Sequence, residues 1–542
     1  MPALPRLRLT GNQLILLAAL WMTLLGNLSY YRKVLDIYPP DTGQLPFLLS
    51  ILGLQFAFTV LLLALVVWRP ILKPVLTVIL LAAAFAAYFM DSYGIVIDRD
   101  MIRNTLETNV AEAGDLLSWR LLGYVVLLGV LPSVMVWRTQ LTPLSPGRAL
   151  LLRGRLILFT LIALAAIIFA FYKPYSSFFR EHKTVRYYSN PVYFIYSGLR
   201  YASEQWIDSR QTFTRIGLDA RLREQRGKPR LVVVVVGETA RADHFSLNGY
   251  ARPTNPRLEQ REGLISFRQF HSCGTSTALS VPCMFSKLTR EDFSNSEARN
   301  SDNVLDILQR AGVAVLWLDN NSSSKGVADR VPFEDFRSPE RNPVCDPECR
   351  DAGMLSRLPR FIEENSGRDI VIVLHQMGNH GPAYYKRYPK AFEVFKPVCH
   401  TNELDQCSVE EISNAYDNAI RYTDDFLDRL INLLQDHDDR YATAMWYISD
   451  HGESLGENGI YLHGLPYFLA PEAQTRVPSI LWLGASVPPE LREAAASRRD
   501  QPLSHDNLFD SLLDLVGVNT DAFTAEDSLF RPKNAMNASQ KP

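Results

Sequence analysis

The chain has 542 residues and a formal net charge of -2 at pH 7, so it can hold several domains and has no basic excess for nucleic-acid binding. Its mean hydropathy of -0.05 averages two unlike parts. Residues 1 to about 173 are very apolar, whereas the rest is polar and punctuated like a globular domain. The composition therefore predicts a membrane part followed by a soluble part.

Five apolar runs in the first part are each long enough, or nearly so, to cross a hydrocarbon core, which takes about 20 residues. They lie near 13–30, 45–68, 74–93, 121–137 and 156–172. The first run has the position of a signal peptide, but no small-residue cleavage site follows it and four more runs lie behind it. We therefore expect an N-terminal transmembrane domain of five helices.

The charges between these runs predict the orientation, because Lys and Arg favour the cytoplasmic side. The third connection is mainly acidic. Basic residues gather before the first run, after the second and after the fourth: Arg6, Arg8, Arg69, Lys73, Arg138, Arg148, Arg153 and Arg155. The alternation predicts a cytoplasmic N-terminus and places everything after Tyr172 outside. In a Gram-negative cell, the chain would lie in the inner membrane with its soluble part in the periplasm.

The cysteines point to the same compartment. All six lie in the soluble part, in three pairs close in sequence: Cys273 and Cys283, Cys345 and Cys349, Cys399 and Cys407. An even number of closely spaced cysteines favours disulfides in an oxidising compartment. Buried free thiols or a metal cluster are the alternatives, although no CxxC spacing occurs.

The soluble part begins with a polar, aromatic stretch and then alternates strands with helices. Residues 174–228 resemble a linker with an interfacial helix, because Tyr and Phe favour the headgroup zone. From 229 to 542, apolar runs such as "RLVVVVVGE" and "DIVIVLHQMG" alternate with amphipathic helical patterns. This alternation predicts an α/β domain with a largely parallel sheet, behind a transmembrane domain at 1–173.

Three predicted strands end in residues that bind metals. They end in Glu238, in His375 and His380, and in Asp450, His451 and Glu453; His463 follows in "YLHGLP". Parallel strands bring these ends to one edge of a sheet, where ligands bind. Carboxylates with imidazoles suit zinc, and hard oxygen ligands also admit Mg²⁺ or Mn²⁺. A single histidine near a strand end more often makes a structural hydrogen bond. Three strand ends that all carry metal-binding residue types favour a metal site.

Hydroxyl groups in "HSCGTSTALSVPCMFS" could provide a nucleophile. The candidates are Thr275, Ser276, Thr277 and Ser280, which lie between Cys273 and Cys283 at a plausible helix start. A hydroxyl at a helix N-terminus beside a metal is well placed to ionise and attack phosphorus. The equal alternative is that these residues only cap the helix.

Four segments together resemble the lipid A phosphoethanolamine transferases, which include the mobile colistin resistance enzymes and belong to the alkaline phosphatase superfamily. They are "GETARADHFSLNGYARPTNP", "CGTSTALSVPCMFS", "HQMGNHGPAYY" and "SDHGESLGENGIYLHGLPY". The resemblance covers essentially the whole chain and implies a soluble domain of alkaline phosphatase/sulfatase-like fold. It also implies transfer of phosphoethanolamine from phosphatidylethanolamine to a phosphate of lipid A, which confers resistance to cationic peptides such as polymyxin.

Carried over residue by residue, the resemblance implies a role for each matching position. Zinc would be held by Glu238, Thr277, Asp450 and His451, with Thr277 as the nucleophile that carries the phosphoethanolamine. His380 and His463 match two histidines that bind the phosphate or a second zinc. On spacing alone, Asn104, Thr108 and Glu112 form a solvated helix face, but they match polar substrate-binding residues of the family. We expect a monomer that contacts membrane lipid and both lipid substrates.

Other functions remain open from the sequence. A phosphoethanolamine transferase acting on core heptose or another envelope glycan, or a glycerophosphate transferase, would share the fold and nucleophile. A sulfatase would need a C/S-x-P-x-R motif, and none starts at Thr277. A non-catalytic membrane sensor is disfavoured by the intact ligand set. One departure from the family is the four-residue spacing of Cys345 and Cys349, tighter than its middle disulfide leads us to expect.

Overall fold

The computed structural model describes residues 7–40, 44–107, 110–182, 184–208, 212–224, 227–346 and 348–531. The chain forms two compact units. The first comprises Met1–Ile102 and Leu117–Ala202, and the second comprises Arg103–Leu116 and Ser203–Pro542. The composition-based boundaries at 173 and 228 stay a prediction.

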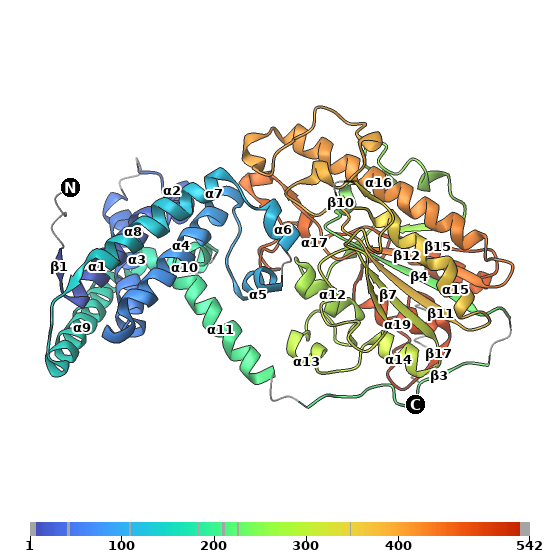
Figure 1. Cartoon of the computed structure of the whole chain (residues 1–542), viewed down its shortest axis with the longest axis horizontal. Coiled ribbons are helices and arrows are strands. Elements are labelled where there is room, and N and C mark those ends of the chain that lie inside the picture. The colour runs from blue at the N-terminus through green and yellow to red at the C-terminus, as the bar shows by residue number, and fades with distance from the viewer. Residues whose placement is uncertain are drawn as a thin grey trace. The chain divides into compact units, whose positions relative to one another are not determined.

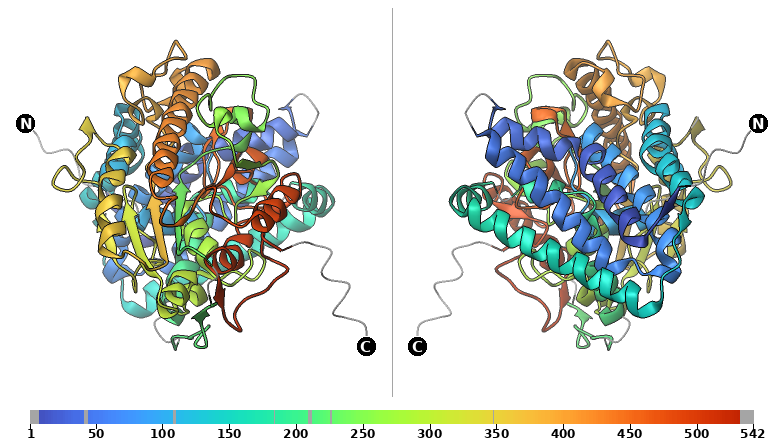
Figure 2. Two further views of the ribbon diagram at one scale, coloured as in Figure 1. Left: turned by 90° about the vertical axis from the view of Figure 1, so that its right-hand side faces the viewer. Right: turned by 90° about the vertical axis from the view of Figure 1, so that its left-hand side faces the viewer.

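The first unit is a bundle of apolar helices. Within the described residues, four stretches are long and apolar enough to cross a membrane: α3 (Leu45–Val66), Arg69–Tyr93 with α4 (Leu72–Tyr93), Trp119–Arg138, and α9 (Pro146–Ala170). A fifth is present if α1 (Gly11–Leu25) and α2 (Leu28–Ile37), which are bent by 55°, count as one span. The right-hand view of Figure 2 looks onto these helices. The prediction of five apolar spans is confirmed on that count.

Large apolar side chains cover the outside of this bundle. Phe159 and Phe169 of α9 are 67% and 82% exposed. Exposure of such an apolar surface to water would be unfavourable, whereas contact with the lipid tails of a membrane would be favourable. After α9 come α10 (Tyr172–Glu181) and α11 (Val192–Asp208), in the stretch predicted to hold an interfacial helix.

The second unit is built on a seven-stranded sheet in the order β5-β15-β12-β4-β11-β7-β8. Its strands are β4 (Arg230–Gly237), β5 (Leu264–Phe267), β7 (Ala314–Asp319), β8 (Phe333–Asp335), β11 (Ile370–His375), β12 (Ala442–Ser449) and β15 (Ser479–Leu483). The five strands from β12 to β8 are parallel, and β15 is antiparallel to both its neighbours. The predicted, largely parallel sheet is confirmed.

Helices cover both faces of this sheet, which explains the five consecutive valines of β4. Val232, Val234 and Val236 pack into a core with α12 (Thr277–Phe285), α14 (Val304–Arg310) and α19 (Asn507–Val516). The intervening valines point to the opposite face and are also fully buried. Figure 1 shows α16 (Val409–Gln435) on that opposite face, with α14 and α19 across the sheet from it. The left-hand view of Figure 2 shows the same layers.

α5 (Arg99–Glu107) begins in the first unit and ends in the second. Other helices of the second unit are α6 (Val110–Asp115), α13 (Asn295–Arg299), α15 (Leu358–Glu364), α17 (Glu472–Thr475) and α18 (Pro489–Ser497). Of these, α6 belongs to the second unit although it lies in the sequence between two membrane-spanning helices.

Candidate metal centre and nucleophile

The three neighbouring central strands end side by side. Glu238 follows β4, His375 ends β11, and Asp450 and His451 follow β12. Because these strands are parallel and adjacent, their carboxyl ends lie at one edge of the sheet. Glu238, Asp450 and His451 each offer a ligand atom, and these atoms lie within 4.8 Å of one another. All three side chains are fully buried.

Thr277 is the hydroxyl that meets this group. It is the first residue of α12, and its Oγ1 lies 3.0 Å from Oε2 of Glu238 and 3.3 Å from Nε2 of His451. Two of the other candidates bond elsewhere: Thr275 donates to the Leu465 carbonyl, and the Ser280 hydroxyl accepts from the Gly274 N–H. The helix start also places the N-terminal dipole of α12 at Thr277.

The donor set fits a cation such as zinc. Nδ1 of His451 lies 2.9 Å from the Gly452 carbonyl, which can only accept, so in the neutral ring Nδ1 carries the hydrogen and Nε2 offers its lone pair toward the carboxylates. Nε2 is 3.4 Å from both Glu238 Oε1 and Asp450 Oδ2. Among the described residues, Asp450 Oδ2 makes no hydrogen bond, although it is buried. A bound metal ion would give a partner to His451 Nε2 and to Asp450 Oδ2, and its charge would offset the negative charge of the two buried carboxylates.

The charges confirm a negative environment. Burial by itself lowers the pKa of His451, but the attraction of Asp450 and Glu238 outweighs it and raises the pKa above the ordinary value. Asp450 Oδ1 accepts from the N–H groups of Thr239, 3.1 Å away, and His451, 2.7 Å away. Glu238 Oε2 accepts from Asn321 Nδ2 at 2.8 Å. These donors fix the carboxylates without neutralising them.

The turn after β4 is strained around this group. Thr239 has φ of 57°, an unfavourable conformation for a β-branched residue. It is held by its hydroxyl bond to Glu238 and by Tyr416, whose hydroxyl donates to the Thr239 carbonyl at 2.7 Å. Such strain persists where the surroundings fix it, often at functional sites. Gly378 (φ 47°) approaches the same turn, and a Cβ there would lie 2.9 Å from the Glu238 carbonyl oxygen.

His463 and His380 lie next to the ligand group. The His463 ring is 4.3 Å from that of His451 and 5.9 Å from that of His380, between centroids. Burial lowers the pKa of both His380 and His463 to about 3. Glu453 Oε2 lies 2.8 Å from Nδ1 of His463, and Tyr384 donates its hydroxyl to the other oxygen. Two neutral imidazoles therefore lie beside His451, one of the candidate ligands.

His375 takes a different position from the other strand-end residues. Its Nδ1 lies 2.9 Å from Asp319 Oδ2, at the end of the neighbouring strand β7. The attraction of Asp319 offsets burial and raises the pKa of His375. Sequence reasoning missed Asp319 and Asn321, although "LDNN" gave the same signal, a fourth strand ending in polar residues.

The predicted membrane-loop residues are described only in part. Asn104 lies in α5 and Glu112 lies in α6. Thr108 and the side chain of Glu112 lie outside the described residues. The role of this helix face stays a prediction.

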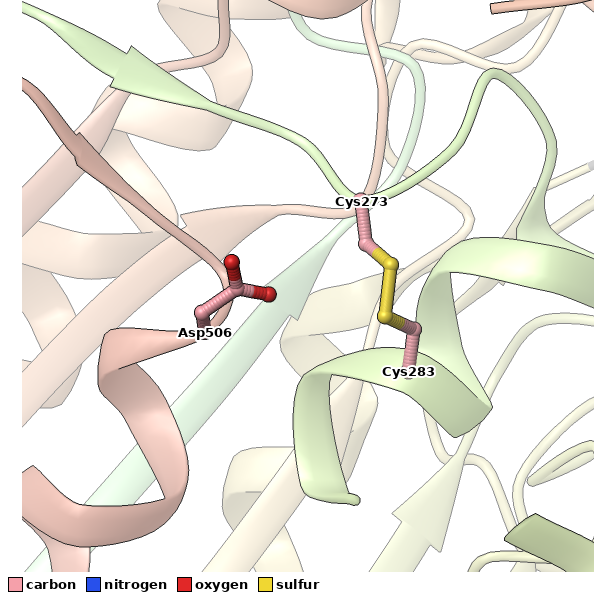
Figure 3. A group of neighbouring side chains, drawn as sticks. All are labelled: Cys273, Cys283 and Asp506. Atoms are coloured by element: carbon pink, nitrogen blue, oxygen red, sulfur yellow. A yellow bond between two sulfur atoms is a disulfide. The ribbon is translucent and has the colours of Figure 1, made fainter. Parts of the chain in front are cut away.

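The three predicted disulfides are present: Cys273–Cys283, Cys345–Cys349 and Cys399–Cys407. Cys273–Cys283 joins the loop before Thr277 to α12. Asp506 lies beside this bond, in a second group that has metal-ligand residue types (Figure 3). Because the two sulfurs are bonded to each other, they are not thiolate ligands, and Asp506 instead accepts from the Arg290 N–H at 2.9 Å.

His505 connects the nucleophile loop to the ligand strand. The Cys273 N–H donates to its Nδ1 at 3.0 Å, and its Nε2 donates to the carbonyl of Ser449, the last residue of β12, at 2.9 Å. Burial lowers the pKa of His505 to about 3, so the neutral ring makes both bonds. The two halves of the site are thereby fixed to each other.

Comparisons with known proteins agree with this geometry. The family models for "Sulfatase" and "Phosphoethanolamine transferase EptA/EptB" match residues 230–518 and 55–206. The chain is 43% identical to phosphatidylethanolamine transferase Mcr-1 of Escherichia coli over 531 residues, which are 96% of this chain and 97% of that protein. The chain belongs to the phosphoethanolamine transferase family.

Further relatives of this family match over nearly the full length. Phosphoethanolamine transferase EptA of Escherichia coli K12 is 39% identical over 529 residues, 95% of this chain and 96% of EptA. The solved structure of the integral membrane protein lipooligosaccharide phosphoethanolamine transferase A from Neisseria meningitidis is 33% identical. It superposes with a TM-score of 0.92, covering 97% of this chain and 99% of that one. The predicted family and two-part fold are thus confirmed.

Proposed function

We propose that this chain transfers phosphoethanolamine from phosphatidylethanolamine to a phosphate of lipid A through a covalent intermediate on Thr277. One observation carries the proposal: the Thr277 hydroxyl lies within 3.3 Å of both Glu238 and His451, at the centre of the candidate metal ligands. Relatives of similar length are named for phosphatidylethanolamine or phosphoethanolamine transfer. A more distant relative, 25% identical, is named for transfer to Kdo(2)-lipid A.

The resident metal would be zinc, held by Glu238, Asp450, His451 and Thr277. When bound, zinc lowers the pKa of the Thr277 hydroxyl and offsets the charge of the transferring phosphoryl group. The chain's own part is to position the hydroxyl, the two carboxylates and Nε2 of His451 before any substrate arrives.

The reaction then has two displacements. Thr277 Oγ1 forms a bond to the phosphorus of phosphatidylethanolamine, and the bond from phosphorus to the diacylglycerol oxygen breaks. A phosphate oxygen of lipid A next attacks the same phosphorus and releases Thr277. His463 lies beside the ligand His451, and His380 lies beside His463. Both imidazoles are neutral at pH 7, which supports their role in binding the phosphoryl oxygens. The product carries an ammonium group, which weakens binding of polymyxin-like cationic peptides.

The location follows from the substrates and the charge pattern. We propose that the helices span the bacterial inner membrane, with the N-terminus in the cytoplasm and the sheet unit in the periplasm. The basic connections and the three disulfides support this orientation. We propose that the chain acts as a monomer.

The test is mass spectrometry of lipid A from cells that express the chain. Lipid A from cells that express the wild type should carry phosphoethanolamine, and lipid A from cells that express Thr277→Ala should carry none. Phosphoethanolamine found on core heptose alone would assign the alternative acceptor. No modification of either fraction by well-expressed protein would contradict the proposed function.

A further inference from the structure

The side chain of Arg387 is charged but only 2% exposed, and it contacts three separate segments. Its Nε donates to the His380 carbonyl at 2.6 Å. Its Nη1 reaches both carboxylate oxygens of Glu348, at 2.7 and 2.6 Å, and its Nη2 donates to Asp115. The rigid fork of a guanidinium suits this task, because its N–H groups point in fixed directions.

The first contact comes from the segment Arg103–Leu116, which is compact with the sheet unit. Asp115 is the last residue of α6 and is held by more than Arg387. Its Oδ1 accepts from Lys386 Nζ at 2.5 Å, and its carbonyl accepts from Asn402 Nδ2 at 2.6 Å. Burial alone would raise the pKa of Asp115, but Arg387 and Lys386 lower it below the ordinary value. Asp115 is therefore a carboxylate at neutral pH.

The second contact is a small hairpin closed by a disulfide. Strands β9 (Cys345–Asp346) and β10 (Glu348–Cys349) pair directly, and Cys345 is bonded to Cys349. The hairpin presents Glu348 to Arg387. Arg350 completes the attachment: it pairs with Asp346 and donates to the Lys386 carbonyl. The two cations at 386 and 387 are thus matched by Asp115 and Glu348.

The third contact reaches the site itself. His380 lies in the loop after β11, where its N–H donates to the Met377 carbonyl at 3.2 Å and Arg387 holds its own carbonyl. Gly381 follows, and a Cβ there would lie 2.6 Å from Oε1 of Glu453. The backbone on both sides of His380 therefore has little room to move, and the guanidinium of Arg387 holds the His380 carbonyl in place.

We propose that Arg387 is a positioning residue that couples the docking of segment 103–116 to the placement of His380 for phosphoryl transfer. Asp115 and Glu348 hold the guanidinium, and the guanidinium holds the His380 carbonyl. This inference rests on the proposed function, because it gives His380 a part in the reaction. Loss of the Asp115 carboxylate should move His380, although Asp115 contacts no reacting atom.

Loading of Thr277 provides a direct measurement. The full-length chain in mixed lipid and detergent micelles is given phosphatidylethanolamine with a fluorescent acyl chain and no acceptor. Each competent enzyme should release one fluorescent diacylglycerol as the Thr277 Oγ–P bond forms and the hydroxyl proton passes to the leaving oxygen. The amplitude counts competent enzymes and the rate constant reports chemistry per enzyme, so a partly unfolded variant loses amplitude rather than rate.

Asp115→Asn should lower the loading rate constant about tenfold with unchanged amplitude, because small displacements of positioning groups cost rate. Glu348→Gln should act in the same direction. The double variant Asp115→Asn with Arg387→Gln should be no slower than Arg387→Gln alone, because both changes act through one side chain. Glu107→Gln is the matched control: it removes another ion pair of the same segment, with Arg299, and should load at the wild-type rate.

Hydrogen exchange reports the coupling without activity. The amides of Asn379 and His380 donate to the Glu238 and Met377 carbonyls, so they should be protected in the wild type. They should exchange faster in Asp115→Asn but not in Glu107→Gln. The inference would be overturned if Asp115→Asn loaded at the wild-type rate or if the rate losses of Asp115→Asn and Arg387→Gln multiplied in the double variant. Unchanged hydrogen exchange of Asn379 and His380 in Asp115→Asn would also overturn it. If Arg387→Gln shows no amplitude, the double variant Asp115→Asn with Glu348→Gln replaces it. Its loss of loading rate should again be smaller than the product of the two single losses, because both carboxylates act through Arg387. Absence of diacylglycerol release by the wild type would instead contradict the proposed function.

Discussion

Oγ1 of Thr277 lies 3.0 Å from Oε2 of Glu238, although the two residues are 39 positions apart in the chain. The contact joins the start of α12 to the end of β4. It gives a buried threonine hydroxyl a carboxylate partner at the site where Asp450 and His451 also converge. A threonine that only capped a helix would not need this arrangement.

Replacing the hydroxyl should therefore stop transfer and leave the fold intact. Thr277→Ala is expected to lower phosphoethanolamine transfer at least about a thousandfold, because it removes the hydroxyl that lies within 3.3 Å of both Glu238 and His451. Mass spectrometry of lipid A and circular dichroism of the purified protein measure the two effects. Thr277→Ser keeps a hydroxyl and should retain measurable transfer. Wild-type modification by Thr277→Ala would remove Thr277 from the mechanism.

The metal site gives a second prediction, which needs no substrate. Asp450→Ala should weaken zinc retention more than about tenfold, because it removes a buried ligand oxygen. Zinc per protein is measured by elemental analysis after dialysis against a weak chelator. Glu457→Gln is the control: its carboxylate lies 2.6 Å from Arg241 Nη1, outside the ligand group. Equal zinc contents in wild type and Asp450→Ala would show that Asp450 is not a ligand.

Much of this site could be predicted from the sequence, because the site residues follow parallel strands of one sheet. Parallel strands bring their carboxyl ends to one edge of a sheet, so the residues after β4, β11 and β12 could be grouped without a structure. That group also contained His375, His380 and Glu453, and the family resemblance reduced its ligands to Glu238, Asp450 and His451. The family resemblance then selected Thr277 from four hydroxyls. Its 3.0 Å distance to Glu238 agrees with that choice.

Contacts between distant loops could not be predicted in this way. His505 and Cys273 are separated by 232 positions, and Arg387 and Asp115 by 272. No periodicity or motif marks such pairs, because a single hydrogen bond or ion pair constrains only two residues. The positive φ of Thr239 was equally invisible, since a β-branched residue after a strand predicts extended backbone.

The disulfide beside the nucleophile should stabilise its loop. Cys273 and Cys283 are ten positions apart, and closing a loop of that length is worth about 3 kcal/mol in the chain-entropy model. Replacing both with serine should lower the urea midpoint and the transfer rate. Cys399 and Cys407, eight positions apart, provide a matched pair whose loss should spare the transfer rate. Thiol labelling of unreduced, denatured protein checks the premise: six reactive thiols would contradict the disulfides and the periplasmic location.

His505 should make the stability of the sheet unit depend on pH. Its pKa is lowered to about 3 in the folded chain, against about 6.5 when unfolded, so the unfolded state binds the extra proton between those values. The stabilisation is complete above pH 6.5 and falls as the pH drops toward 3, because protonated Nδ1 would face the Cys273 N–H. Between pH 7.5 and 5 this one ring should cost about 2 kcal/mol of unfolding free energy. His505→Gln can keep a donor to the Ser449 carbonyl but does not titrate, so its urea melts in detergent should lose about 2 kcal/mol less than the wild type over that range. Equal pH dependence in both proteins would mean that the His505 ring is not held neutral, and that the bridge between the nucleophile loop and β12 is absent in solution.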